Sequence, residues 1–168
     1  MKILVVSGFL GAGKTTFIRT LAERTKKDFA VMENEYGAVN VDGDLLEQTN
    51  DLNIWELTEG CICCSMQNDF ATSILTIANT VDPEYLIVEP TGVGMLSKII
   101  ENIQKIEYER ITLLEPLTIL DGTMYDRCMF EFSEICEDQI QSAGRILVSK
   151  MEYAAENERA GSKVCKRN

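Results

Sequence analysis

Residues 8–16 read Gly-Phe-Leu-Gly-Ala-Gly-Lys-Thr-Thr and carry the strongest signal in the chain. They match the phosphate-loop pattern, in which a glycine and four further residues precede Gly-Lys-Ser/Thr. The apolar run at residues 3–6 predicts a buried strand before this loop, and Phe17, Ile18 and Leu21 recur behind it at helical spacing. A strand, a glycine loop and a helix N-terminus together direct backbone N–H groups toward one anion. The sequence therefore predicts a nucleotide-binding site, with a chance glycine-rich turn as the alternative.

The residues of this loop have separate expected roles. Its glycines allow the backbone to close around phosphate groups, where a Cβ would clash. Lys14 is expected to reach the β- and γ-phosphates, and the Thr15 hydroxyl is expected to hold Mg²⁺. The expected nucleotide contacts in the loop are Gly8, Gly11, Ala12, Gly13, Lys14, Thr15 and Thr16.

Composition limits the class of protein. A chain of 168 residues suits one domain with a substantial core, and a net charge of −11 argues against nucleic acid as a general partner. No stretch approaches the roughly 18 apolar residues of a membrane span, and the first strand follows Met1-Lys2 directly, so we expect a cytoplasmic protein. Six cysteines in such a chain indicate metal or redox chemistry, and the absence of histidine leaves thiolates, carboxylates or water as metal ligands.

Short apolar runs alternate with amphipathic stretches along the chain. Such alternation predicts an α/β fold with a mostly parallel sheet and helices on both faces. The expected domain covers residues 1–152, followed by a polar, frayed tail at 153–168. Apolar residues at helical spacing lie at 70–78, 95–103 and 132–140. The predicted strands are residues 3–7, 29–33, 53–57, 85–89, 116–120 and 145–149.

A compact cysteine cluster follows the third predicted strand. Cys61, Cys63 and Cys64 lie within four residues, so their thiolates can converge on one soft cation such as Zn²⁺ or Cu⁺. Three protein ligands would leave a fourth position for a carboxylate, water or an acceptor protein. A redox pair and buried small side chains are the alternatives, and the isolated Cys136 is expected in the core because it lies on an apolar helical face.

Acidic residues follow two other predicted strands. Carboxylates at Glu33, Glu35 and Asp42 could hold water on Mg²⁺, complete a thiolate site or remain solvated loop charges. Glu89 ends an apolar strand, at the sheet edge where ligands of α/β proteins gather, and is expected to reach a Mg²⁺-bound water or the attacking water. Gly92 is expected to offer a backbone N–H to the γ-phosphate.

The segment Ser149-Lys150-Met151-Glu152 follows the last predicted strand, where nucleotide-binding proteins of this plan often read the base. Ser149, Lys150 and Glu152 are therefore expected nucleotide contacts. A carboxylate that accepts two hydrogen bonds from guanine would select GTP over ATP, but Glu152 is one methylene longer than aspartate. The choice between GTP and ATP stays open at this point.

Four motifs together resemble the CobW family, in the GTPase class that includes the metallochaperones HypB and UreG: GFLGAGKTT at 8–16, ENEYGAVNVD at 33–42, EGCICC at 59–64 and VEPTG at 88–92. The resemblance implies a P-loop NTPase fold and GTP hydrolysis coupled to trafficking of zinc or cobalt to an acceptor protein, with nucleotide-dependent self-association. The chain departs from the family in three ways. Ser149 and Glu152 replace Asn and Asp of the base-reading loop, Ala38 replaces an acid, and the usual last strand and C-terminal domain do not follow.

The resulting hypothesis is a slow Mg²⁺-dependent GTPase that binds a transition metal through its three clustered cysteines. A nucleotide-binding adaptor with a structural zinc and an inactive fragment are the alternatives. A kinase is the weakest alternative, because neither a lid nor acceptor-binding arginines are evident.

Overall fold

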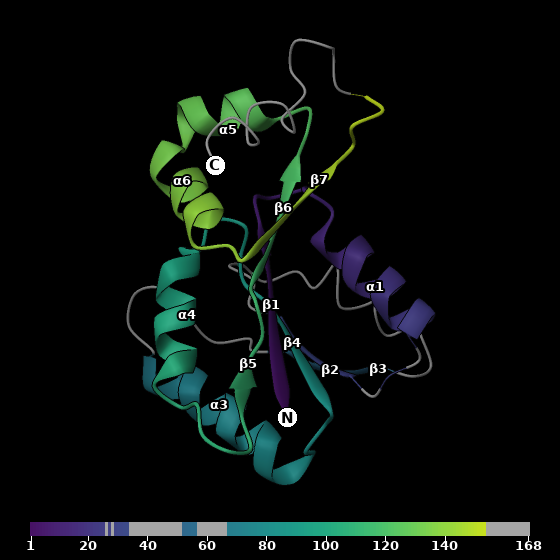
Figure 1. The fold of residues 1–168 in the computed structure, drawn as a ribbon, viewed down its shortest axis with the longest axis vertical. Coiled ribbons are helices and arrows are strands. Elements are labelled where there is room, and N and C mark those ends of the chain that lie inside the picture. Colours follow the sequence, from purple (N-terminus) through teal and green to yellow (C-terminus); the bar gives the residue numbers. More distant parts are fainter. Residues whose placement is uncertain (26, 28, 34–51, 57–66, 154–168) are drawn as a thin grey trace.

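The computed structural model describes residues 1–25, 27, 29–33, 52–56 and 67–153 (Figure 1). The strands in these residues form one sheet in the order β3-β2-β4-β1-β6-β7, and β5 also pairs with β1. All of these strand pairings are parallel, as the alternation of strands and helices predicted. The strands are β1 (Lys2–Gly8), β2 (Phe29–Glu33), β3 (Leu52–Glu56), β4 (Tyr85–Glu89), β5 (Thr112–Leu113), β6 (Leu117–Asp121) and β7 (Arg145–Ser149).

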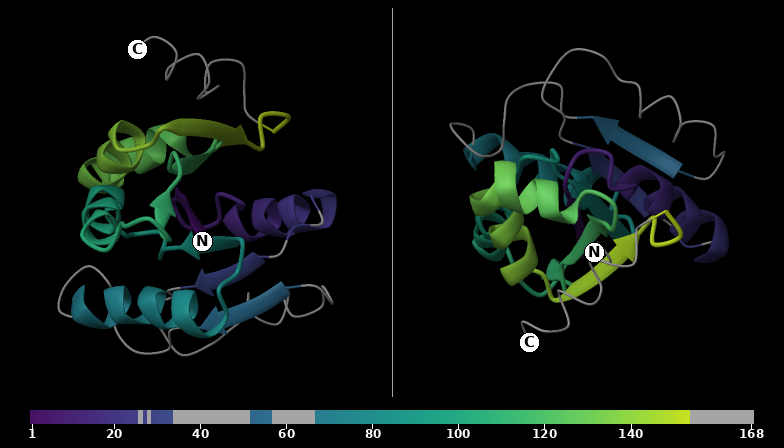
Figure 2. Two further views of the ribbon diagram at one scale, coloured as in Figure 1. Left: turned by 60° about the horizontal axis from the view of Figure 1, so that its bottom comes forward. Right: turned by 90° about the horizontal axis from the view of Figure 1, so that it is seen from above.

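Helices cover both faces of the sheet (Figures 1 and 2). Because side chains alternate along a strand, Ile3 of β1 contributes to one buried cluster and Val6 to another. Phe70 and Ile99 complete the first cluster from α3 and α4, and Ile18 enters the second from α1. The predicted two-sided arrangement is therefore confirmed. The helices are α1 (Lys14–Thr25), α3 (Gln67–Thr80), α4 (Leu96–Gln104), α5 (Tyr125–Glu131) and α6 (Ser133–Gln141).

Two elements differ from the expectation. The two-residue strand β5 was not predicted, because Thr112 and Leu113 are too few to give a periodic pattern. The apolar pattern at 132–140 corresponds to α6, but its first residue, Phe132, stands outside the helix with φ −137° and separates α6 from α5. Its ring packs against Phe9, with 5.0 Å between the centroids, so a tertiary contact accompanies the helix break.

The carboxyl ends of the strands bring together Glu33, Glu89 and Ser149, which the sequence singled out, with Asp121, which it did not. The β2–β4 register pairs Glu33 with Glu89, and the β6–β7 register pairs Asp121 with Ser149. The phosphate loop follows β1, which lies between β4 and β6. Candidate site residues far apart in the chain therefore meet at one edge of the sheet.

Several predicted features lie outside the described residues. These are the cysteines at 61, 63 and 64, the acidic segment after Glu33, and the tail beyond Tyr153. In the part of the chain that is described, no helix combines the length and apolar character needed to cross a membrane.

Candidate nucleotide-binding site

The phosphate loop joins β1 to α1 through a backbone that requires glycine. Gly8, Gly11 and Gly13 all have positive φ angles, of 144°, 74° and 97°. A Cβ on Gly8 would also overlap the carbonyl oxygen of Ile119 on β6, so only glycine allows the two strands to approach here. Helix α1 begins at Lys14, immediately after the loop, which leaves its first N–H groups available to an anion.

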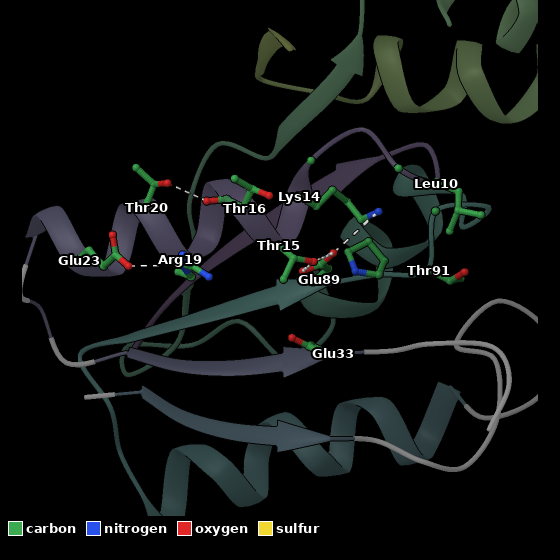
Figure 3. Close-up of a pocket in the computed structure, with 14 residues that line it drawn as sticks. Leu10, Lys14, Thr15, Thr16, Arg19, Thr20, Glu23, Glu33, Glu89 and Thr91 are labelled. Carbon is green, nitrogen blue, oxygen red and sulfur yellow. Dashed lines mark hydrogen bonds and ion pairs between the residues drawn. The ribbon is translucent and has the colours of Figure 1, made fainter. Parts of the chain in front are cut away.

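A cavity of about 490 Å³ opens beside this loop (Figure 3). Its wall combines the phosphate loop and α1 with the ends of β2 and β4 and the turn after β4. The lining residues are Leu10, Gly11, Gly13, Lys14, Thr15, Thr16, Arg19, Thr20, Glu23, Glu33, Glu89, Pro90, Thr91 and Gly92. The phosphate loop, Glu89 and Gly92, which the sequence analysis placed in one nucleotide site, therefore line one cavity together with Glu33.

Three polar side chains converge inside the cavity (Figure 3). Lys14 is buried, and its Nζ lies 3.8 Å from Oε1 of Glu89. The Thr15 hydroxyl donates toward the same carboxylate, at 3.3 Å from Oε1 and 3.4 Å from Oε2. A hydroxyl and a carboxylate are hard oxygen donors of the kind that Mg²⁺ prefers, so Thr15 and Glu89 fit a magnesium ion bound with nucleotide phosphates.

Glu33 belongs to the same cavity. Its side chain is 8% exposed, and its strand partner across the β2–β4 ladder is Glu89. The cavity thus holds two carboxylates on neighbouring strand ends, with Lys14 as a buried cation beside Glu89. The sequence proposed Glu33 as a metal ligand together with three thiols, and those thiols lie outside the described residues.

The segment after β7 holds the phosphate loop from the other side. The Ser149 hydroxyl donates to the carbonyl oxygen of Ala12 at 2.7 Å, and Lys150 Nζ donates to that of Gly11 at 2.8 Å. Lys150 also pairs with Asp121 at 2.7 Å. Glu152 lies in the exposed turn that follows. Ser149 and Lys150 therefore act on the backbone of the phosphate loop, which the sequence did not reveal.

Asp121 is held in its ionised form by this arrangement. Burial opposes ionisation, but hydrogen bonds from Lys150 and Thr123 outweigh it and keep the pKa of the Asp121 carboxyl below its ordinary value. Thr123 donates to Oδ1 through both its backbone N–H, at 2.8 Å, and its hydroxyl, at 2.6 Å. An ionised Asp121 in turn orients Lys150 toward the phosphate loop.

The turn after β4 forms part of the cavity wall beside the phosphate loop. Gly94 N–H donates to the carbonyl oxygen of Thr91 at 2.8 Å. Gly92 packs so closely on the phosphate loop that a Cβ there would lie 2.6 Å from the backbone nitrogen of Leu10. The expected contact of Gly92 with a γ-phosphate remains a prediction, but its place in the cavity wall agrees with it.

Sequence reasoning missed Arg19, Thr91 and Asp121 among the residues in or beside this site. Arg19 lies one helical turn after Thr15, and that four-residue spacing could have indicated a shared helix face. Its Nε pairs with Glu23 at 3.4 Å on the rim of the cavity. Asp121 ends a buried strand as Glu89 does, and the same argument could have found it.

The parallel sheet, the phosphate loop and the polar cavity at its edge define a P-loop nucleotide-binding domain. The sequence profile of the CobW/HypB/UreG nucleotide-binding domain matches residues 2–167. The chain therefore belongs to this family, as its motifs suggested.

Curated relatives include two proteins of Escherichia coli. The chain is 33% identical to the zinc chaperone YjiA over 99% of its own length and 54% of that protein, and 34% identical to the zinc chaperone YeiR over 87% and 45%. The crystal structure of Zn(II)-bound YjiA GTPase from E. coli superposes with a TM-score of 0.71, at 28% identity over 98% of this chain and 54% of that one. The hydrogenase maturation factor HypB from Archaeoglobus fulgidus, at 15% identity and a TM-score of 0.68, shows the shared fold alone. The chain spans about half the length of the E. coli relatives.

Proposed function

We propose that residues 1–152 form a Mg²⁺-dependent GTPase domain that couples its nucleotide state to the binding and delivery of zinc or cobalt in the cytoplasm. The observation that carries the proposal is the convergence of Lys14, Thr15 and Glu89 in a cavity walled by the phosphate loop. The names of the relatives support zinc as the metal, since YjiA and YeiR are zinc chaperones and a Dictyostelium discoideum relative is a zinc-regulated GTPase metalloprotein activator.

The residues of the cavity have different proposed roles in the transfer of phosphate to water. Lys14 places a buried positive charge against the β- and γ-phosphates, and the loop N–H groups surround the same oxygens. Thr15 and Glu89 would hold Mg²⁺, which would supply charge neutralisation at these phosphates, and Glu89 would also help to orient the attacking water. Turnover without a partner is expected to be slow, on the order of 10⁻⁴ to 10⁻² per second, the range of P-loop GTPases that act alone.

Guanine is the proposed base. Ser149 and Lys150 support the backbone of the phosphate loop, and this fixes the turn that carries Glu152 at the same edge of the sheet. Glu152 is exposed, so its carboxylate is free to accept hydrogen bonds from the guanine ring N–H and exocyclic amine. Replacing Glu152 by Gln removes the charge that this pairing uses and should reduce the preference for GTP over ATP.

The proposed metal ligands Cys61, Cys63 and Cys64 follow strand β3 closely. The β3–β2 and β2–β4 registers align Glu56, Glu33 and Glu89 across the sheet. At about 4.8 Å per strand, the chain leaves β3 roughly 10 Å from Glu89. The cysteine cluster lies five to eight residues further along the chain, and its response to the γ-phosphate is part of this proposal. An acceptor protein or a second copy of the chain would then receive or shield the metal.

The proposal is tested by nucleotide binding and single-turnover phosphate release. Wild-type protein should bind Mg-GTP and release phosphate slowly, whereas Lys14→Ala should lose binding, because the phosphates lose their buried cation. Lys98→Ala is the matched control, since Lys98 is an exposed residue of α4 outside the cavity. Wild-type protein with no affinity for Mg-GTP or Mg-ATP would contradict the proposal. Binding without any phosphate release would identify a nucleotide-binding adaptor instead.

A further inference from the structure

A buried glutamine connects α6 to the turn after β4. The Gln139 side chain is fully buried, and its Nε2 donates to the carbonyl oxygens of Gly92 at 3.2 Å and Gly94 at 3.0 Å. Carbonyl oxygens only accept hydrogen bonds, so this pair of neighbours fixes which end of the amide faces the turn. One side chain thus holds both ends of the Gly92–Gly94 segment.

Helix α6 is itself fixed to the sheet at the same residue. The Thr118 hydroxyl, fully buried on β6, donates to the backbone carbonyl oxygen of Gln139 at 2.7 Å. The turn in turn packs against the phosphate loop, where Gly92 approaches the backbone of Leu10. A continuous series of contacts therefore runs from β6 through Gln139 and the turn to the phosphate loop.

Gln139 does not line the cavity, so any effect that it has on a ligand passes through the turn. A buried amide is costly unless its hydrogen bonds are used. Here the amide nitrogen donates to backbone that forms the cavity wall, whereas Oε1 has no hydrogen-bond partner among the described residues. Nearby on α6, Cys136 is buried and Ile140 packs against the apolar cluster of Leu120 and Tyr125. An apolar residue at 139 could fill the same space but would leave the two carbonyl groups without this donor.

We propose that Gln139 is a positioning residue that sets the preference of the site for triphosphate over diphosphate. Its amide holds the Thr91–Gly94 turn where the Gly92 N–H meets the third phosphate. A diphosphate is held by the loop at residues 8–16 and does not need the turn. This inference rests on the proposed nucleotide site.

The test compares Gln139→Met with Gln141→Met. Methionine keeps the length of the side chain but cannot donate, and Gln141 is an exposed residue of the same helix. The measurements are the Kd values for a non-hydrolysable GTP analogue and for GDP, both with Mg²⁺. In Gln139→Met the triphosphate-to-diphosphate preference should fall about tenfold, as expected for the loss of two neutral hydrogen bonds, with the GDP Kd within about twofold of wild type. Gln141→Met should match wild type.

The outcomes of these binding measurements distinguish a failure of the proposed function from a failure of the positioning role of Gln139. If wild-type protein binds neither nucleotide, the proposed function fails and this inference falls with it. The positioning role alone is overturned if wild type prefers triphosphate and Gln139→Met keeps that preference. It is also overturned if the substitution raises the Kd values of both nucleotides by the same factor. Should Gln139→Met not fold, Thr118→Val replaces it, because it removes the hydroxyl that fixes the Gln139 backbone to β6 and should therefore loosen the hold of the Gln139 amide on the turn. An unchanged preference in Thr118→Val would then overturn the proposal, and a reduced one would support it.

Discussion

Asp121 shows how one ionised residue can stabilise this domain and order its phosphate loop. Its pKa lies below the ordinary value of 3.8, because hydrogen bonds from Lys150 and Thr123 outweigh burial. A pKa that is lower in the folded than in the unfolded chain stabilises the folded state above pH 4, and this contribution is lost as pH falls through the folded-state value. Asp121→Asn should therefore lower the free energy of unfolding by about 1–2 kcal/mol at pH 7 and by much less near pH 3.

Urea unfolding of wild type and variant at both pH values measures this difference. Glu109→Gln is the control, because Glu109 is an exposed carboxylate on a surface turn. Equal destabilisation of Asp121→Asn at pH 7 and pH 3 would show that the carboxylate charge is not what stabilises the fold.

At the scale of elements, α4 depends on a residue from another helix. No side chain of its own caps its N-terminus, and the backbone N–H of Ser97 donates instead to Oδ2 of Asp138 on α6, at 3.1 Å. Asp138→Ala should lower the free energy of unfolding by about 1 kcal/mol, the usual cost of losing an N-terminal cap. Glu137→Ala removes an equal charge from an exposed position of α6 and should change stability by less than about 0.5 kcal/mol. Chemical denaturation measures both, and equal losses would contradict the capping role.

The helices and strands could largely be predicted from the sequence, because hydrophobic periodicity and the residues that end helices and strands are local signals. All six expected strands are present with ends within one residue, and Cys136 is buried as its place on an apolar helix face implied. Contacts between distant segments could not be predicted in this way. Nothing near Gln139 in sequence indicates that its amide binds the turn at Gly92, and nothing near Lys150 points to the carbonyl group of Gly11. Such pairs exist only once the sheet brings its strand ends together.

For the whole molecule, the sheet order explains how nucleotide and metal could influence each other. Strand β4 carries Glu89 and the turn that forms part of the cavity wall, and β2 lies between it and β3, from which the cysteine segment departs. A change at the γ-phosphate would have to cross one strand, β2, to reach the strand that precedes the proposed metal ligands in the chain. Thermodynamic linkage then requires the effect to be mutual, since a metal that responds to nucleotide must change nucleotide affinity by the same factor.

This linkage predicts that metal affinity depends on the nucleotide. In titrations with Co²⁺, followed by thiolate-to-metal absorption, and with Zn²⁺, affinity should differ by about fivefold or more between the GTP-analogue and GDP states. Lys14→Ala should keep the metal affinity of the nucleotide-free protein and lose its response to GTP, because only the phosphate site is damaged. Cys63→Ser should weaken metal binding while nucleotide still binds. Identical metal affinity with GTP analogue, with GDP and without nucleotide would show that the two sites work independently, even if each of them exists.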